Sequence, residues 1–240
     1  MIIMLNVLFG TTVFVSVASF ILALFMTRNF TSTHGKSQLF WSIGLWLFFI
    51  DALLEILFAI GTADQVLFDI YLFTVAILVQ SLSIGSILLL KKPIYNRVYS
   101  IFSVIADVLL AITLVMFPTG NILVGGIVAG VLPLAVIIMS SIISFPAAII
   151  LIATAIISFR KTSNKKMISI IIGTIIVSVA GSLYIVSFPE TLYYAELLGI
   201  IFLWSRFFNF NSTLLDYTNI HTDAQLRVQM LIVVYYYPLT

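Results

Sequence analysis

The chain has 240 residues, of which 62% are hydrophobic and 8% are charged, with a formal net charge of +2. Soluble domains carry about 25% charged residues, and a globule of this size cannot bury so much apolar side-chain surface. The composition therefore excludes a protein that faces water on all sides, and the absence of cysteine excludes disulfides and thiolate metal sites.

Seven apolar runs predict an all-α fold, a polytopic membrane helix bundle of seven transmembrane helices within residues 1–210. Each run has roughly the 20 residues that a helix needs to cross the hydrocarbon layer, whereas the strands of a membrane barrel would alternate. Residues 1–27 lack a basic start and a cleavage pattern, so we expect this run to be retained. The predicted spans are 3–27, 38–61, 68–90, 98–117, 137–159, 167–188 and 193–210.

The basic residues occupy alternate connections between these runs. The first, third and fifth connections and the region at or after the last span hold all eleven Lys and Arg residues. The remaining connections hold Asp64, Asp69, Glu190 and Glu196 instead. Because short loops rich in Lys and Arg stay in the cytoplasm, we expect a multi-pass protein of the cell membrane with its N-terminus outside and its C-terminus inside.

Two further segments allow more than one interpretation. Residues 121–136 are apolar but rich in glycine, and they either re-enter the membrane or form a cap on its outer surface. Residues 211–240 form a predicted cytoplasmic tail with an amphipathic helix. The tail ends in the apolar stretch 230–237, which we expect to pack on the membrane, on the bundle, on another membrane subunit or on a second copy.

Four polar residues fall within the predicted spans and are candidates for an ion or proton pathway. Asp51 and Glu55 are four residues apart in the second span, on one helix face, and Asp107 lies in the fourth span at a similar depth to Asp51. Gln80 falls near the middle of the third span. Intramembrane carboxyl groups are costly and often functional. With no basic residue predicted at their depth, we expect them to be protonated, hydrogen bonded to each other or to Gln80, or bound to a cation. The alternative is a neutral polar cluster that fixes helix packing.

Several familiar membrane chemistries are excluded by the sequence. Both histidines, His34 and His221, fall in predicted cytoplasmic segments, so we expect no haem and no histidine metal site in the bundle. The seventh span has no lysine for a retinal Schiff base, and no hydrolase, metalloprotease or nucleotide-binding motif occurs. We therefore expect no enzyme activity, no cofactor, no metal and no nucleic-acid partner.

The second and third predicted spans resemble a group of uncharacterised prokaryotic seven-helix integral membrane proteins. In that group a Trp-containing helix carries a Glu near its outer end, which matches Glu55. The next helix begins with a Tyr-Leu pair, here at 71–72, and ends in a glycine-rich stretch, matched by 84–86 with Ser83 in place of the first glycine. The resemblance implies a seven-helix fold and brings no known activity. A looser likeness is to the seven-helix sensor regions that precede some histidine kinases.

Three functional hypotheses follow. The protein is a non-catalytic subunit or scaffold of a larger membrane assembly, which the apolar tail and short loops favour. Alternatively, it is a small proton- or cation-coupled transporter or channel that uses the intramembrane carboxyl groups. A membrane sensor is the third hypothesis.

Overall fold

The structure is a computed structural model that describes residues 2–62, 64–120, 123–124, 127–128, 132–162, 172–173, 175–176 and 190–207. Within these ranges five helices are long and apolar enough to cross a membrane. They are α1 (Ile2–Thr33), α2 (Lys36–Ala59), α3 (Gln65–Leu89), α4 (Pro93–Met116) and α5 (Leu134–Thr162). A further helix, α7 (Glu190–Phe207), follows. A helical membrane bundle is therefore confirmed, while most of the predicted sixth span, 167–188, and the tail, 211–240, lie outside the described residues.

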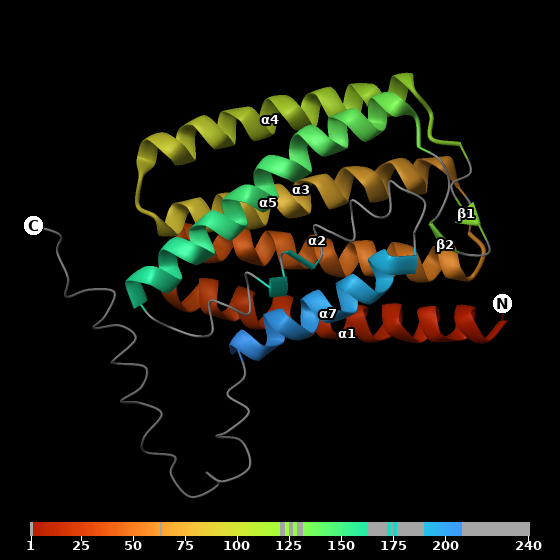
Figure 1. Ribbon diagram of the computed structural model, residues 1–240, viewed down its shortest axis with the longest axis horizontal. Helices are drawn as coiled ribbons and strands as arrows, with labels where there is room; N and C mark the ends of the chain where they lie inside the picture. Colours follow the sequence, from red (N-terminus) through yellow and green to blue (C-terminus); the bar gives the residue numbers. More distant parts are fainter. Residues whose placement is uncertain are drawn as a thin grey trace, which may run out of the picture. The chain divides into compact units, whose positions relative to one another are not determined.

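Helix α3 is the centre of the bundle. It packs against α2 on one side and against α4 and α5 on the other, and α1 packs against the outer side of α2. Helices α1 to α5 alternate in direction along the chain, as Figure 1 shows. Helix α7 lies beside α1, where the indole Nε1 of Trp204 donates a hydrogen bond of 3.2 Å to the carbonyl oxygen of Ala18.

Helix α1 continues past the predicted end of the first span at residue 27. The hydroxyl groups of Thr31, Ser32 and Thr33 donate hydrogen bonds of 2.8–2.9 Å to carbonyl oxygens one turn earlier. These bonds satisfy polar groups that would otherwise favour a loop. The first connection is therefore shorter than predicted, and the left-handed backbone of His34, at φ 53°, ends the helix.

Helices α3 and α4 begin before their predicted starts at residues 68 and 98. The side chain of Asp64 accepts a hydrogen bond of 2.8 Å from the backbone N–H of Val66, which caps α3. Pro93 is the first residue of α4, where a missing backbone N–H costs nothing. Local capping chemistry sets both starts, whereas the prediction followed hydropathy.

The segment after α4 contains a short hairpin that the sequence did not predict. Strands β1 (Leu123–Val124) and β2 (Ile127–Val128) pair antiparallel, with Leu123 opposite Val128. Leu123 and Leu132 pack against an apolar cluster at one end of α2 and α3, made of Leu54, Phe58, Phe68 and Tyr71. Both interpretations of residues 121–136, a re-entrant segment and a surface cap, stay predictions.

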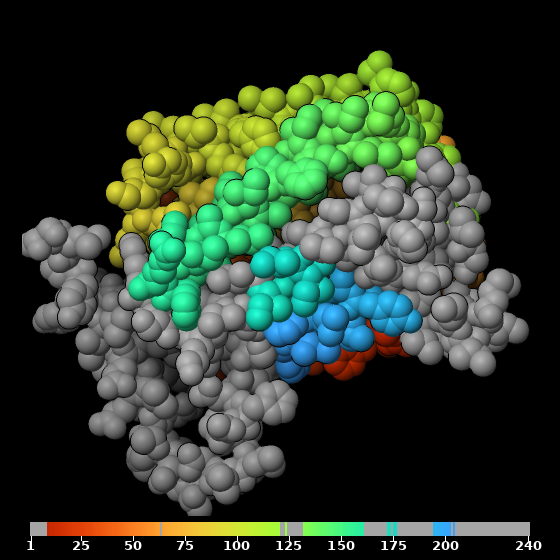
Figure 2. Space-filling model, in the orientation of Figure 1, coloured from red at the N-terminus to blue at the C-terminus, as the bar shows by residue number. Residues whose placement is uncertain are grey.

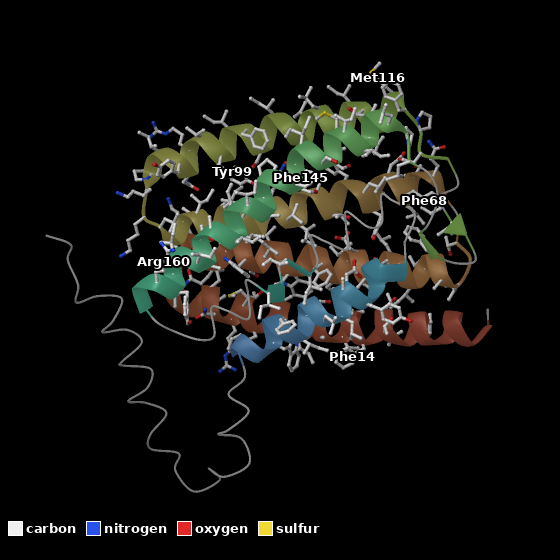
Figure 3. The ribbon with its side chains drawn as sticks, in the orientation of Figure 1. Phe14, Phe68, Tyr99, Met116, Phe145 and Arg160 are labelled. Atoms are coloured by element: carbon white, nitrogen blue, oxygen red, sulfur yellow. The ribbon has the colours of Figure 1, made fainter. Side chains whose placement is uncertain are left out.

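Basic residues gather at one end of the bundle. Figure 3 shows Arg160 at the opposite end from Phe68 and Met116. The helix bounds place the other basic residues of α1 to α4 at the same end as Arg160: Arg28, Lys36, Lys91, Lys92 and Arg97. The capping residue Asp64 lies at the end that holds Phe68. The charge segregation seen in the sequence is thus present in the folded bundle.

Candidate functional site

Helix α2 contributes two of the four predicted pathway residues to the interior. Asp51 and Glu55 are one turn apart, and each has 3% of its surface exposed. Both lie on the face of α2 that packs against α3. The structure therefore places these carboxyl groups away from the surrounding lipid, as their cost in hydrocarbon requires.

Helix α3 supplies a hydroxyl donor to each of these carboxyl groups. The phenol of Tyr71 donates a hydrogen bond of 2.8 Å to Oε1 of Glu55. Oγ1 of Thr74 donates a short hydrogen bond to Oδ1 of Asp51. Tyr71 and Thr74 are three residues apart on α3, which is the spacing needed to face two acids four apart on α2. Neither donor was singled out from the sequence.

A third carboxyl group comes from α7. Glu196 lies next to Glu55 and close enough to Asp51 for direct electrostatic interaction. The sequence analysis assigned Glu196 to an outer connection, and that assignment is wrong. The available signal was its position three residues inside the predicted run 193–210. We call Asp51, Glu55 and Glu196 the carboxyl cluster.

The carboxyl cluster keeps polar atoms that the surrounding helices do not satisfy. Oδ2 of Asp51 and Oε2 of Glu55 are buried and accept no hydrogen bond from the described part of the chain. Within that same part, no basic side chain interacts with any of the three acids. Two carboxylates offer only acceptors, so a hydrogen bond between Glu55 and Glu196 requires a proton between them.

Asp107 and Gln80 lie apart from the carboxyl cluster. Gln80 of α3 faces Asp107 of α4, and Asp107 is not among the groups that act on Asp51. Of the three predicted acids, only Asp107 lies near Gln80, and Nε2 of Gln80 forms no hydrogen bond within the described residues. Nine residues separate Tyr71 from Gln80, and nine steps of a 3.6-residue helix end on the opposite face. One face of α3 therefore contacts α2, and the opposite face contacts α4.

Asp107 belongs to a second polar group. The phenol of Tyr99 is close to Ser83, Ser103 and Asp107. Ser83 also joins α3 to α5, because its hydroxyl donates a hydrogen bond of 3.0 Å to the carbonyl oxygen of Ala147. We call Gln80, Ser83, Tyr99, Ser103 and Asp107 the polar seam.

An apolar cleft of about 460 Å³ lies between α4 and α5, which run side by side in Figure 2. It is lined by Phe102, Ile137, Ile138, Ser141, Ile142, Phe145 and Pro146. None of the predicted pathway residues lines this cleft. Its lining fits a lipid chain better than a polar solute.

Within the ranges that the structure describes, no group of three or more His, Asp or Glu side chains is arranged to hold a metal ion. The tail, 211–240, which was predicted to be cytoplasmic and to associate with a partner or a second copy, lies outside those ranges. The subunit hypothesis therefore stays a prediction.

No protein-family model, curated protein or solved structure matches the chain. The resemblance noted in the sequence consequently stays a prediction.

Proposed function

We propose that the protein is a small proton-coupled membrane transporter or channel in which the carboxyl cluster carries the proton. The observation that supports this most directly is the convergence of Asp51, Glu55 and Glu196 from two helices. Each of the two acids on α2 keeps one buried oxygen without a hydrogen-bond donor among the described residues. Buried acids without cationic neighbours are characteristic of proton relays in transporters.

The geometry suggests a separate role for each carboxyl group of the cluster. Tyr71 donates to one oxygen of Glu55, and Thr74 donates to one oxygen of Asp51. The second oxygen of each acid is therefore able to take up or release a proton. Glu55 and Glu196 share a proton between α2 and α7, and Asp51 accepts it one helical turn along α2. A shift of α7 breaks the shared hydrogen bond, which couples proton movement to a change of conformation.

This proposal is tested by proton flux into liposomes that contain the purified protein and a pH-sensitive dye. Glu55→Gln and Asp51→Asn preserve side-chain size but cannot carry the proton, so we expect roughly ten-fold or greater loss of flux. Asp69→Asn is the matched control, because Asp69 also accepts a hydrogen bond from a hydroxyl group, 3.0 Å from Thr119, but lies on α3 outside the cluster.

Unchanged flux in well-folded Glu55→Gln and Asp51→Asn proteins would leave only a structural role for the cluster. Gel filtration and thermal unfolding in detergent check that each variant is folded. An equal loss in Asp69→Asn would show that the assay reports general damage. The proposal assigns no catalytic step to the protein.

We also propose seven crossings, with the N-terminus outside and the C-terminus in the cytoplasm of a cell-membrane protein. The gathering of basic residues at one end of the described bundle supports this orientation, because such residues stay on the cytoplasmic side. Association with other membrane subunits and a sensory role stay predictions from the sequence.

A further inference from the structure

The polar seam has more unsatisfied polar atoms than helix packing alone explains. Nε2 of Gln80, the hydroxyl of Tyr99, Oγ of Ser103 and Oδ1 of Asp107 are all buried, and none forms a hydrogen bond within the described ranges. Gln80 and Ser103 each have 2% of their surface exposed, and Tyr99 has 7%. A buried polar group without a partner costs roughly 1–3 kcal/mol, so four of them in one place call for a ligand that joins them.

The unsatisfied atoms form a row and are not scattered. Tyr99, Ser103 and Asp107 are four residues apart in turn, so they lie one above another on a single face of α4. Gln80 and Ser83 of α3 lie against this row. Eight residues of α-helix span about 12 Å, which is the length of several water molecules in file.

The atoms also carry the right mixture of donors and acceptors for water. Gln80 offers an N–H donor, Asp107 offers a carboxyl oxygen, and the Tyr99 and Ser103 hydroxyls can both donate and accept. Gln80 and Asp107 are neighbours, yet the amide nitrogen and carboxyl oxygen named above are not bonded to each other. A buried water typically makes about three hydrogen bonds to such groups, so it can bridge them.

We propose that the polar seam binds a file of water molecules between Tyr99 and Asp107. This file leads from Asp107 toward the end of the bundle that carries Lys91 and Lys92. The hydration itself stands independently of the carboxyl cluster, whereas its use as a proton route depends on the proposed function.

The chain contains no cysteine, so single cysteines report water access without background. The experiment measures how fast a water-soluble, cationic methanethiosulfonate modifies the thiol of Ser103→Cys. It uses permeabilised membranes, so that the reagent reaches both sides. Only the thiolate reacts, and thiols in an apolar environment stay protonated. The matched controls are Ala106→Cys, at 3% exposed in the apolar core, and Ile105→Cys, at 56% exposed on the outer surface of α4.

We expect Ser103→Cys to react roughly ten-fold faster than both controls, because only the seam is hydrated. Gln80→Cys repeats the measurement from α3 and serves if Ser103→Cys does not fold. A rate at either folded seam position no higher than at Ala106→Cys and Ile105→Cys would overturn the proposal.

Labelling does not depend on transport, so the two proposals fail separately. A dry seam together with loss of flux in Glu55→Gln would remove the water file and leave the carboxyl cluster. A reactive seam together with normal flux in Glu55→Gln would leave the water file and remove the proton-carrying role of the carboxyl cluster.

Discussion

At the residue scale, two glycines allow α2 and α3 to approach closely. A Cβ atom added at Gly85 would lie 2.5 Å from Cδ1 of Trp41 and 3.1 Å from the carbonyl oxygen of Ser37. One added at Gly44 would lie 2.7 Å from Cδ2 of Leu82. Ser37 also donates a hydrogen bond of 2.6 Å to the carbonyl oxygen of Gly85. Small residues at close helix contacts are a common source of stability in membranes.

Gly85→Ala should therefore destabilise the bundle by roughly 1–3 kcal/mol, because Trp41 and the α2 backbone must move to admit a methyl group. Thermal unfolding in detergent measures the effect. Gly10→Ala is the control, since a Cβ at Gly10 meets no atom within 4 Å, and it should leave the unfolding temperature nearly unchanged. Equal stability of the two variants would contradict the close approach seen here.

Residue-scale reasoning from the sequence recovered the acids on α2 but not their partners. Asp51 and Glu55 stand out because they interrupt an apolar run. Tyr71 and Thr74 do not stand out, since tyrosine and threonine are common in membrane helices. Their role depends on which face of α3 meets α2, and that is set by tertiary packing.

At the element scale, α7 brings the third acid to the site. Its attachment to α1 includes the hydrogen bond from the Trp204 indole to the carbonyl oxygen of Ala18. Trp204 lies eight residues after Glu196, a little over two helical turns along α7. The position of Glu196 beside Glu55 therefore depends on how α7 is anchored.

Trp204→Phe removes the N–H donor but keeps an aromatic ring, so we expect it to loosen α7 and to lower proton flux. We expect a reduction of roughly three- to ten-fold, which corresponds to about 1 kcal/mol for a lost hydrogen bond. Leu198→Ala is the control on the same helix, because Leu198 is 45% exposed. Normal flux in folded Trp204→Phe protein would show that this anchor does not position Glu196.

The sequence predicted the central helices well because long apolar runs have few alternatives in a membrane. It misplaced their ends, which capping at Asp64, Pro93 and the hydroxyl-rich end of α1 determines. It also named Gln80 among the alternative partners of the intramembrane acids, although the nine-residue spacing from Tyr71 puts the Gln80 and Tyr71 side chains on opposite faces of α3. The β1–β2 hairpin was missed because apolar, glycine-rich runs carry no clear period.

At the scale of the whole molecule, the basic end of the described bundle should face the cytoplasm. Single cysteines at Thr33, the last residue of α1 at its basic end, and at Thr62, between α2 and α3, distinguish the two sides. A membrane-impermeant maleimide added to intact expressing cells should label Thr62→Cys and spare Thr33→Cys. Both should react once the membrane is opened, which controls for accessibility. Labelling of Thr33→Cys in intact cells would reverse the proposed orientation.

The carboxyl cluster and the polar seam are separate in the folded bundle. The carboxyl cluster occupies the side of α3 that faces α2, with α7 contributing its third acid, and the polar seam occupies the side that faces α4. The sequence placed all four candidate residues in one interior but could not divide them, because the division follows from helix rotation and from a long-range contact of α7.

In the proposed function Glu55 and Glu196 act as one proton-carrying unit, and a double-mutant cycle on proton flux in liposomes is the decisive experiment. Flux is measured for Glu55→Gln, for Glu196→Gln and for the double variant. Groups that work as a unit are strongly non-additive, so we expect each single variant to lose nearly as much flux as the double variant. Wild-type flux in folded Glu196→Gln, or losses that simply multiply in the double variant, would contradict the account.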